Sequence, residues 1–403
     1  MGPVSDLAID KLKKSHDPAA IDVFMKSHAF PLVEGGKVTF CFRGAVEGVN
    51  LKSWVYGLPN SQPLHQLEKT DLWHLTLDIP PKSRVEYKFE IVRHGQGQWI
   101  EDPLNPYRAT DPFGANSVVH GEGYTIPEWT QVDPDARPGT LEPWVVKSKA
   151  FNDTRGFLVY LPARFRKTRR YPLLFVHDGP DYVRFANLKT VLDNLIHRLE
   201  IPDLVVALTG SPNRIGEYAD DERHARYVTE EAIPDLEARL PLIGQPRGRC
   251  LMGASFGGVA SLSTAVRYPG FYGRLLLQSG SFAFSDIGSQ NKRGPLFDPI
   301  ISFMNKFRAT PTSVTEKMFV SCGMHESLIY ENRSLVPMLQ ATEVELKYVE
   351  ARDGHNWENW RDRLREGLSW LFPARCGWST SSSSCTTLAD IAAPFAGPPA
   401  KSD

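Results

Sequence analysis

One short stretch constrains the fold of this chain more than any other: a serine with a glycine two positions away on each side, in Gly253-Ala-Ser255-Phe-Gly257. The apolar run 249–252 before it is typical of a buried strand, and the segment 256–268 after it has the spacing of a helix. A serine on a tight turn between strand and helix needs small neighbours at those two positions, because the backbone leaves no room for side chains. The stretch therefore predicts a sharp turn that exposes Ser255, a candidate nucleophile, beside free backbone amides.

The sequence around this turn predicts its setting. Between residues 144 and 373, apolar runs at 171–177, 203–209, 317–322 and 344–349 alternate with segments of helical periodicity. Such alternation is typical of a three-layer α/β unit around a mostly parallel sheet. Together with the serine turn, the order of elements predicts an α/β-hydrolase fold for residues 144–373.

The N-terminal part of the chain has a different periodicity. Residues 1–30 have helix-like spacing, and residues 31–122 contain short alternating runs rich in β-branched and aromatic residues. The runs lie at 37–43, 51–56, 72–79 and 85–92. Short strands at this spacing predict an all-β sandwich of immunoglobulin type.

Three further segments complete the expected organisation. The stretch 99–116 is rich in proline, so we expect an ordered loop in which Trp99, Tyr107 and Phe113 pack on the sandwich edge in preference to lining a ligand surface. Residues 123–143 are predicted to be a linker, from their Gly, Pro, Asp and Thr content. Residues 374–403, rich in Ser, Thr, Ala and Pro, are predicted to be a disordered tail.

Composition excludes several classes of partner. The chain has 403 residues, and its 46 basic and 47 acidic side chains give a net charge of -1, so no global charge attracts nucleic acid or an acidic membrane. Its five cysteines are odd in number and lack metal-ligand spacing, which predicts reduced thiols and neither metal nor cofactor. Residues 1–14 contain no long apolar run, so we expect a cytoplasmic protein without a signal or spanning helix. The sequence predicts no oligomeric state.

A nucleophilic serine needs a general base, and the order of residues points to one. In α/β-hydrolases the acid and the histidine follow the serine along the chain. Two histidines, His325 and His355, lie after Ser255. His355 lies in a loop between the last predicted strand and the last predicted helix, where the base is expected.

The acid is chosen by its place after a late strand. Glu326 follows the strand 317–322, from which a carboxylate can hold the tautomer of a histidine delivered by the neighbouring strand. Asp353, Glu331 and Asp286 remain alternatives, as does a serine–histidine dyad. The amide of Phe256 is expected to form half of an oxyanion hole.

The second oxyanion donor is expected in the loop 178–182 that follows the strand 171–177. Pro180 has no N–H group, which leaves Gly179 or Asp181. We take Gly179 as the candidate.

Several of these motifs together resemble ferric enterochelin (enterobactin) esterases. They are Gly253-Ala-Ser-Phe-Gly-Gly-Val-Ala-Ser-Leu, Leu277-Gln-Ser-Gly-Ser-Phe282, Gly323-Met-His-Glu326, Gly354-His-Asn-Trp357 and, near the N-terminus, Asp102-Pro-Leu-Asn-Pro106. The likeness covers about residues 20–372, and it is their joint order that makes it specific.

The resemblance implies a serine esterase that hydrolyses a trilactone siderophore of 2,3-dihydroxybenzoyl-serine in the cytoplasm, so that iron is released. Ser255, Glu326 and His355 match the family's catalytic positions. Arg214 and Glu217 match a motif beside its site, where Arg214 would meet an anionic iron-catecholate; pairing of Arg214 with Glu217 is the alternative.

Two other functions remain open. Feruloyl and acetyl xylan esterases have similar hydrolase units. Pro180 departs from the wider esterase pattern, in which an amide-bearing residue follows the Asp-Gly pair, so a binding protein that captures an iron-catecholate without cleaving it is the other alternative.

Overall fold

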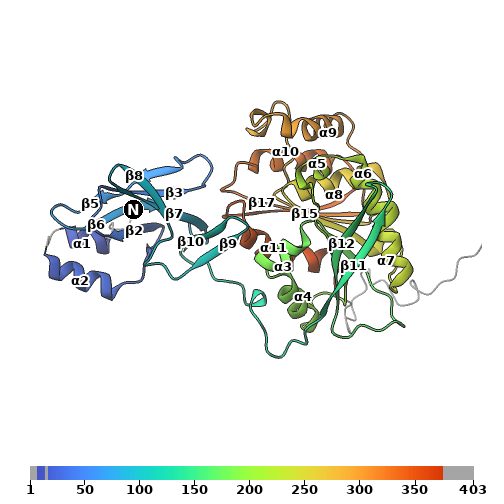
Figure 1. Cartoon of the computed structure of the whole chain (residues 1–403), viewed down its shortest axis with the longest axis horizontal. Coiled ribbons are helices and arrows are strands. Elements are labelled where there is room, and N and C mark those ends of the chain that lie inside the picture. The colour runs from blue at the N-terminus through green and yellow to red at the C-terminus, as the bar shows by residue number, and fades with distance from the viewer. Residues whose placement is uncertain (1–6, 14–16, 375–403) are drawn as a thin grey trace, which may run out of the picture.

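The computed structural model describes residues 7–13 and 17–374, so the predicted tail at 374–403 lies outside them except for its first residue. Two parts are visible in Figure 1: an N-terminal β region (residues 32–120) and a C-terminal α/β region (residues 140–372). None of the helices in these described ranges is long and apolar enough to cross a membrane.

The β region consists of two antiparallel sheets. One has the order β1 (Leu32–Glu34), β2 (Lys37–Arg43), β6 (Leu72–Asp78), β5 (His65–Gln66). The other has the order β4 (Ser61–Pro63), β3 (Gly48–Ser53), β7 (Arg84–Arg93), β10 (Gly114–His120), β9 (Arg108–Asp111), with β8 (Gln96–Ile100) also paired to β7.

The alternation read from the sequence has its cause in the packing of these sheets. In β7 every second residue from Val85 to Ile91 is buried, and Tyr87 and Phe89 pack between the sheets against Phe40 and Phe42 of β2. Helices α1 (Ala8–Lys13) and α2 (Pro18–Ser27) cover the outer face of the first sheet. The two antiparallel sheets predicted for this part of the chain are present.

One prediction for this region is wrong. The stretch 99–116 was expected to be a loop, but β8, β9 and β10 occupy much of it. The prolines at 103 and 106 lie between β8 and β9, where no ladder hydrogen bond is needed, so the flanking residues are free to pair.

The α/β region is organised around one eight-stranded sheet. Its order is β11 (Thr140–Ser148), β12 (Asp153–Leu161), β14 (Val205–Leu208), β13 (Leu173–Val176), β15 (Arg249–Ala254), β16 (Arg274–Gln278), β17 (Lys317–Gly323), β18 (Glu345–Ala351). The six strands from β14 to β18 are parallel, and β11 and β12 are antiparallel. β11 begins inside the stretch 123–143 predicted to be a linker.

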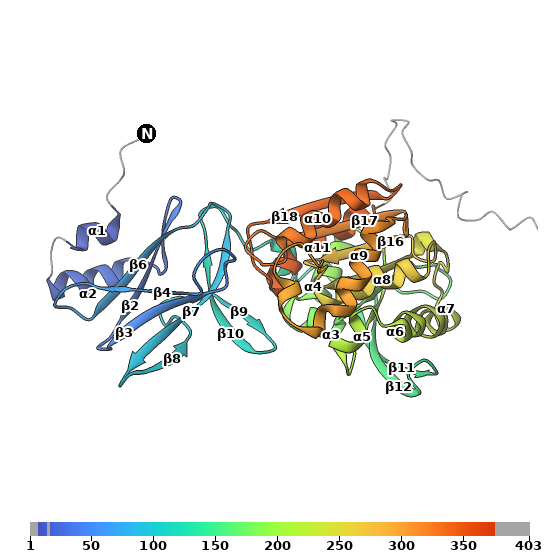
Figure 2. The ribbon, with the colours of Figure 1, turned by 90° about the horizontal axis from the view of Figure 1, so that it is seen from above.

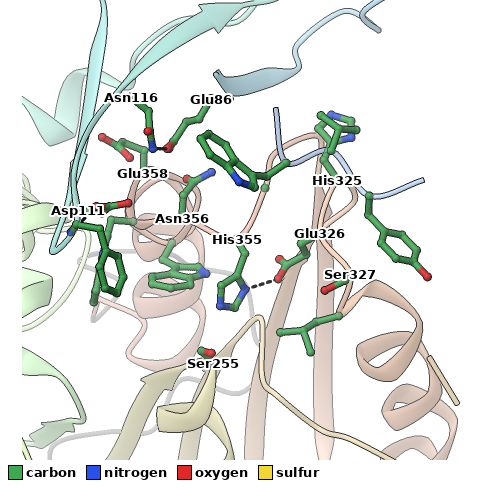
Figure 3. A pocket seen from close by; sticks show the side chains of 18 of the residues that line it. Glu86, Asp111, Asn116, Ser255, His325, Glu326, Ser327, His355, Asn356 and Glu358 are labelled. Atoms are coloured by element: carbon green, nitrogen blue, oxygen red, sulfur yellow. Dashed lines mark hydrogen bonds and ion pairs between the residues drawn. The ribbon is translucent and has the colours of Figure 1, made fainter. Parts of the chain in front are cut away.

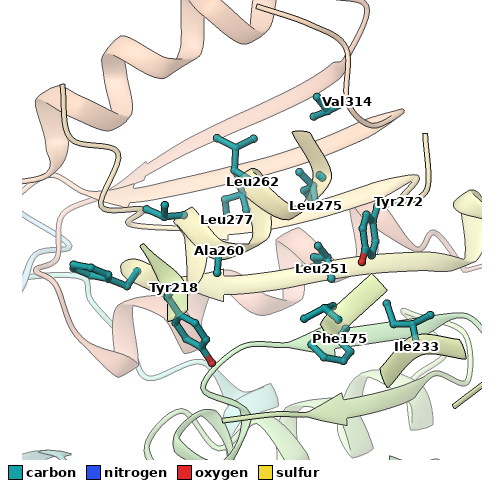
Figure 4. Packing of buried hydrophobic residues seen from close by; sticks show 14 of the residues in the cluster. Phe175, Tyr218, Ile233, Leu251, Ala260, Leu262, Tyr272, Leu275, Leu277 and Val314 are labelled. Carbon is teal, nitrogen blue, oxygen red and sulfur yellow. The ribbon is translucent and has the colours of Figure 1, made fainter. Parts of the chain in front are cut away.

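Helices cover both faces of this sheet, as expected for three layers (Figures 1 and 2). On one face lie α3 (Gly179–Phe185), α4 (Leu188–His197) and α11 (Trp357–Leu371). On the other lie α7 (Ile233–Arg239), α8 (Phe256–Arg267), α9 (Asp298–Ala309) and α10 (Ile329–Gln340), with the short α5 (Arg214–Tyr218) and α6 (Glu222–Arg226) beside them. Figure 4 shows Leu262 of α8 against Leu275 and Leu277 of β16, all fully buried.

This packing confirms the predicted α/β fold and fixes the position of the site. In a parallel sheet the carboxyl ends of all strands lie at one edge, where ligands bind. β15, β17 and β18 end there, and so do the loops that carry Ser255, Glu326 and His355. The β region approaches the same edge, where its backbone bonds to these loops: Tyr56 N–H donates to the carbonyl of His325 (2.7 Å).

Candidate active site

Ser255 lies on the sharp turn between β15 and α8. Its backbone has φ 57° and ψ −122°, a strained conformation for a non-glycine residue. A Cβ at Gly253 would lie 2.3 Å from the carbonyl carbon and oxygen of Gly257, so glycine is required there, as predicted from the sequence. The turn places Ser255 at the floor of a cavity (Figure 3).

His355 and Glu326 come together above this serine. Nδ1 of His355 lies 2.5 Å from Oε2 of Glu326, and Figure 3 shows the imidazole between Glu326 and Ser255. In this structure the Ser255 hydroxyl bonds to the hydroxyl of Ser281 at 3.1 Å. This single hydrogen bond is what restrains the Ser255 hydroxyl. Rotation about χ1 can therefore direct the hydroxyl toward another group in the cavity.

The Glu326 carboxylate is fixed on its other side. It is 3% exposed, and its Oε1 accepts hydrogen bonds from Ser279 Oγ and from the amide of Gly323, both at 2.6 Å. Trp360 donates its indole N–H to Ser279 (3.0 Å) and presents its ring edge-on to His355. Glu326 is thereby held with one oxygen directed at the imidazole.

The three rival carboxylates are occupied elsewhere. Asp353 pairs with Arg84, Asp286 pairs with Arg308 (2.7 Å), and the buried Glu331 accepts the amide of Ser289 (3.2 Å). Of the four candidates, the structure brings Glu326 to His355.

Of the two expected oxyanion donors, the amide of Phe256 is unoccupied within residues 7–13 and 17–374 and that of Gly179 is occupied. The Phe256 N–H makes no hydrogen bond with any residue that the structure describes, and it lies beside Ser255. Gly179 was wrongly predicted as the second donor: its amide donates to the carbonyl of Thr209 (2.7 Å), and a side chain there would collide with the backbone of Leu208. Asp181, the alternative, lines the cavity.

Arg214 and Glu217 also differ from expectation. Arg214 lines the cavity, and its guanidinium bonds to the Asp178 carboxylate (2.7–2.9 Å), so the alternative of a pair with Glu217 is not what the structure contains. Glu217 is 4% exposed and accepts two bonds from Arg155 (2.7 and 3.0 Å). Although burial opposes it, the nearby His224 imidazole and the hydrogen bonds from Arg155 lower the pKa of Glu217 to about 2. Glu217 is therefore part of the scaffold and does not line the cavity.

The cavity has a volume of about 1300 Å³ and is walled by both regions of the chain. Its wall includes Trp54 and Trp99 of the β region, whose rings meet edge-on. Trp99 is 52% exposed, and Phe113, at the tip of the β9–β10 hairpin, is 95% exposed. Trp99 packs on the edge of the β region, against Trp54 and Glu90, and lines the cavity as well. For Phe113, which lines the cavity and is almost fully exposed, the expectation that it packs on the sandwich edge is wrong.

Arg84 lies beside the site, and no motif or periodicity in the sequence indicated it. It is the first residue of β7, is 2% exposed, and its Nη1 bonds to Asp353 (3.1 Å) and Asn356 (2.9 Å), which flank His355. Its Nη2 bonds to Glu86 (2.9 Å) and Glu358 (3.0 Å). The segment 279–281 directly after β16 belongs to a motif that carried the resemblance, but no role was predicted for its serines: Ser279 bonds to Glu326 and Ser281 to Ser255.

Nothing in the described residues has the composition of a metal centre: they contain no group of three His, Cys, Asp or Glu side chains placed to hold an ion. Cys41, Cys250 and Cys322 are buried and unbridged.

Comparisons with known proteins identify relatives of this chain. A family model described as "Putative esterase" matches residues 148–371. The Iron(III) enterobactin esterase of Escherichia coli (strain K12) is 24% identical over 373 residues, which cover 82% of this chain and 90% of that protein.

Solved structures show the same fold. The enterobactin esterase of Shigella flexneri, crystallised in the presence of enterobactin, superposes with a TM-score of 0.70 at 20% identity and covers 87% of this chain and 97% of that one. A ferulic acid esterase covers 58% of this chain and 98% of its own, with a TM-score of 0.51 at 21% identity. The resemblance found in the sequence is confirmed: the chain belongs to this esterase family and is an ester hydrolase related to the enterobactin esterases.

Proposed function

We propose that this protein is a serine esterase that hydrolyses the ester bonds of a trilactone catecholate siderophore such as enterobactin, in the cytoplasm. The observation that carries the proposal is the placement of Ser255, on a strained turn, beneath the hydrogen-bonded pair His355–Glu326 at the floor of a large cavity. Cleavage of the lactone backbone separates the catechol arms, which weakens their joint hold on iron.

The residues would act in sequence. Rotation of the Ser255 hydroxyl from Ser281 toward His355 lets Nε2 take its proton as Oγ attacks the lactone carbonyl. Glu326, bonded to Nδ1, holds the tautomer and stabilises the imidazolium. The developing oxyanion accepts a hydrogen bond from the Phe256 N–H. We assign the second hydrogen-bond donor to the backbone amide of Asp181.

Collapse of this intermediate transfers the proton from His355 to the leaving alkoxide and leaves an acyl-serine. A water molecule, deprotonated by His355, then attacks the acyl-serine and releases the carboxylic acid. The residues assigned to these steps, Ser255, His355, Phe256 and Asp181, all line the cavity.

The walls of the cavity support an aryl-bearing substrate. Its volume exceeds the roughly 300–1,000 Å³ of common small-ligand pockets, which suits a trilactone with three aromatic arms better than an acetyl ester. Exposed Trp54, Trp99 and Phe113 offer faces on which planar rings stack. The aromatic wall also suits a feruloyl ester, so this second activity is part of the test.

The test compares hydrolysis of enterobactin and of methyl ferulate by the wild type and by Ser255→Ala, with products identified by mass spectrometry. We expect linear dihydroxybenzoyl-serine products from the wild type and a loss of at least about 10³-fold in the variant. Binding of enterobactin without turnover would support the alternative of a protein that binds an iron-catecholate without cleaving it. Preferential turnover of methyl ferulate would support the feruloyl esterase.

A further inference from the structure

The charge of the cavity wall bears on which form of the substrate enters it. The lining contains four lysine or arginine side chains, Arg84, Lys88, Arg214 and Arg293. It contains six carboxylates, Glu86, Asp111, Asp178, Asp181, Glu326 and Glu358. The cations are outnumbered, and their individual contacts decide how much positive charge is left for a ligand.

Arg84 offers none. Its guanidinium lies between Asp353, Glu86 and Glu358, at 2.9–3.1 Å from each. Burial raises the pKa of Glu358 to about 7, so this carboxyl is partly neutral at neutral pH. Even then two carboxylates remain against one guanidinium, and this cluster contributes no positive charge to the cavity.

Arg214 is neutralised as well. It pairs with Asp178, and Asp181 lies close enough to both to interact with them electrostatically. Lys88 on β7 and Arg293 in the loop before α9 have no carboxylate within ion-pair distance among the described residues. Lys88 and Arg293 are therefore the two cations of the described cavity wall without a paired carboxylate, and they lie on different elements. Asp111 and the surplus carboxylates of the Arg84 and Arg214 groups oppose them.

The two forms of a catecholate siderophore differ in charge by three. Iron(III) bound by three doubly deprotonated catechols is a trianion. The same ligand without metal keeps its phenolic protons near neutral pH, since the pKa of a phenol is about 10, and it is uncharged. A trianion entering this cavity loses hydration and meets two cations that are unpaired within the described part of the chain, Lys88 and Arg293, which the surplus carboxylates of the wall outnumber.

We propose that this cavity selects the uncharged, metal-free aryl lactone over its ferric trianion. The inference rests on the proposed siderophore esterase activity and assigns its substrate form. Selection acts through the carboxylates of the wall, so it depends on charge and not on the shape of the aromatic arms.

The experiment measures kcat/KM for metal-free enterobactin and for its ferric complex, each at low salt and at about 0.3 M NaCl. We expect the metal-free form to be favoured by about tenfold or more at low salt. Screening should raise the value for the ferric form and leave the metal-free value nearly unchanged. A ferric form that is equally good or better at low salt would overturn the inference while the proposed function stands.

Variants test whether the wall carboxylates are responsible. Asp111→Asn and Asp181→Asn should each lower the ratio of kcat/KM for metal-free enterobactin to kcat/KM for its ferric complex. The double variant should lower this ratio further. Glu68→Gln, which removes an exposed carboxylate outside the cavity, is the matched control and should leave the preference as in the wild type. An unchanged preference in the double variant would contradict the assignment. If neither form is hydrolysed by the wild type, the proposed function fails and the inference fails with it.

Discussion

Replacement of Arg84 by methionine should destabilise the protein in a way that depends on pH. The substitution keeps an unbranched side chain of similar reach and removes the positive charge that Asp353, Glu86 and Glu358 share. Arg84 is 2% exposed, so water cannot replace it. Breaking a buried ion pair by removing one partner costs about 3–5 kcal/mol.

The direction of the pH effect follows from two pKa values. Burial raises the pKa of Asp353 to about 6 and that of Glu358 to about 7, although Arg84 lowers both. The folded protein therefore binds more protons than the unfolded chain between about pH 4 and pH 7, and stability falls as pH rises through this window. Without Arg84 both values rise further, and each added pKa unit costs about 1.4 kcal/mol at high pH.

We therefore expect Arg84→Met to lose about 3–5 kcal/mol of unfolding free energy at pH 8 and less than half as much at pH 5, where the carboxyls are protonated. Denaturant titrations at the two pH values measure this. Arg43→Met, which removes a half-exposed guanidinium paired to Asp22 and Asp71, is the control and should change little at either pH. A loss at pH 8 below about 1 kcal/mol, or one equal at both pH values, would refute the reasoning.

Three further predictions concern the site itself. Glu326→Gln should lower kcat roughly 10³-fold or more with KM nearly unchanged, because the amide no longer holds His355 in the required tautomer; steady-state kinetics on a p-nitrophenyl ester measures this, and a normal kcat would exclude the assigned acid. Trp99→Ala should raise KM for aryl-bearing esters and leave their kcat near the wild-type value, since it removes a stacking face remote from Ser255; a fall in kcat alone would argue against this role. Gly253→Ala should unfold or distort the serine turn, because the added methyl group lies 2.3 Å from the Gly257 carbonyl; a variant with wild-type melting temperature and activity would contradict the geometry.

The three predicted site residues that the structure brings together share one property. Ser255, Glu326 and His355 each follow a strand of the parallel sheet, and parallel strands deliver the residues after them to one edge whatever their separation in sequence. The period of the apolar runs and the glycines of the turn were enough to predict that arrangement.

The errors have a common cause in partners that local sequence does not reveal. Gly179 was chosen because Pro180 has no N–H, but its amide bonds to Thr209, which follows the adjacent strand β14. Glu217 has the spacing to pair with Arg214, yet Arg155 on β12 takes its carboxylate. In both cases the partner lies on an element distant in sequence, the end of β14 for Gly179 and β12 for Glu217.

Contacts between the two regions were the hardest to foresee. Arg84 and Asp353 are 269 residues apart and meet because the β region docks at the edge that carries His355. The same docking turns Trp99 and Phe113 from edge residues into part of the cavity wall. Neither periodicity nor motif spacing contains information on how two folded regions meet.

The central claim is that Ser255 is a nucleophile activated by His355. Reaction with a fluorophosphonate, followed by intact-mass and peptide mass spectrometry, tests it most directly. We expect one adduct per chain, on Ser255, with its formation slowed at least about 10²-fold in His355→Ala. An adduct on another residue, or one that forms on Ser255 at the wild-type rate without the imidazole, would contradict the account.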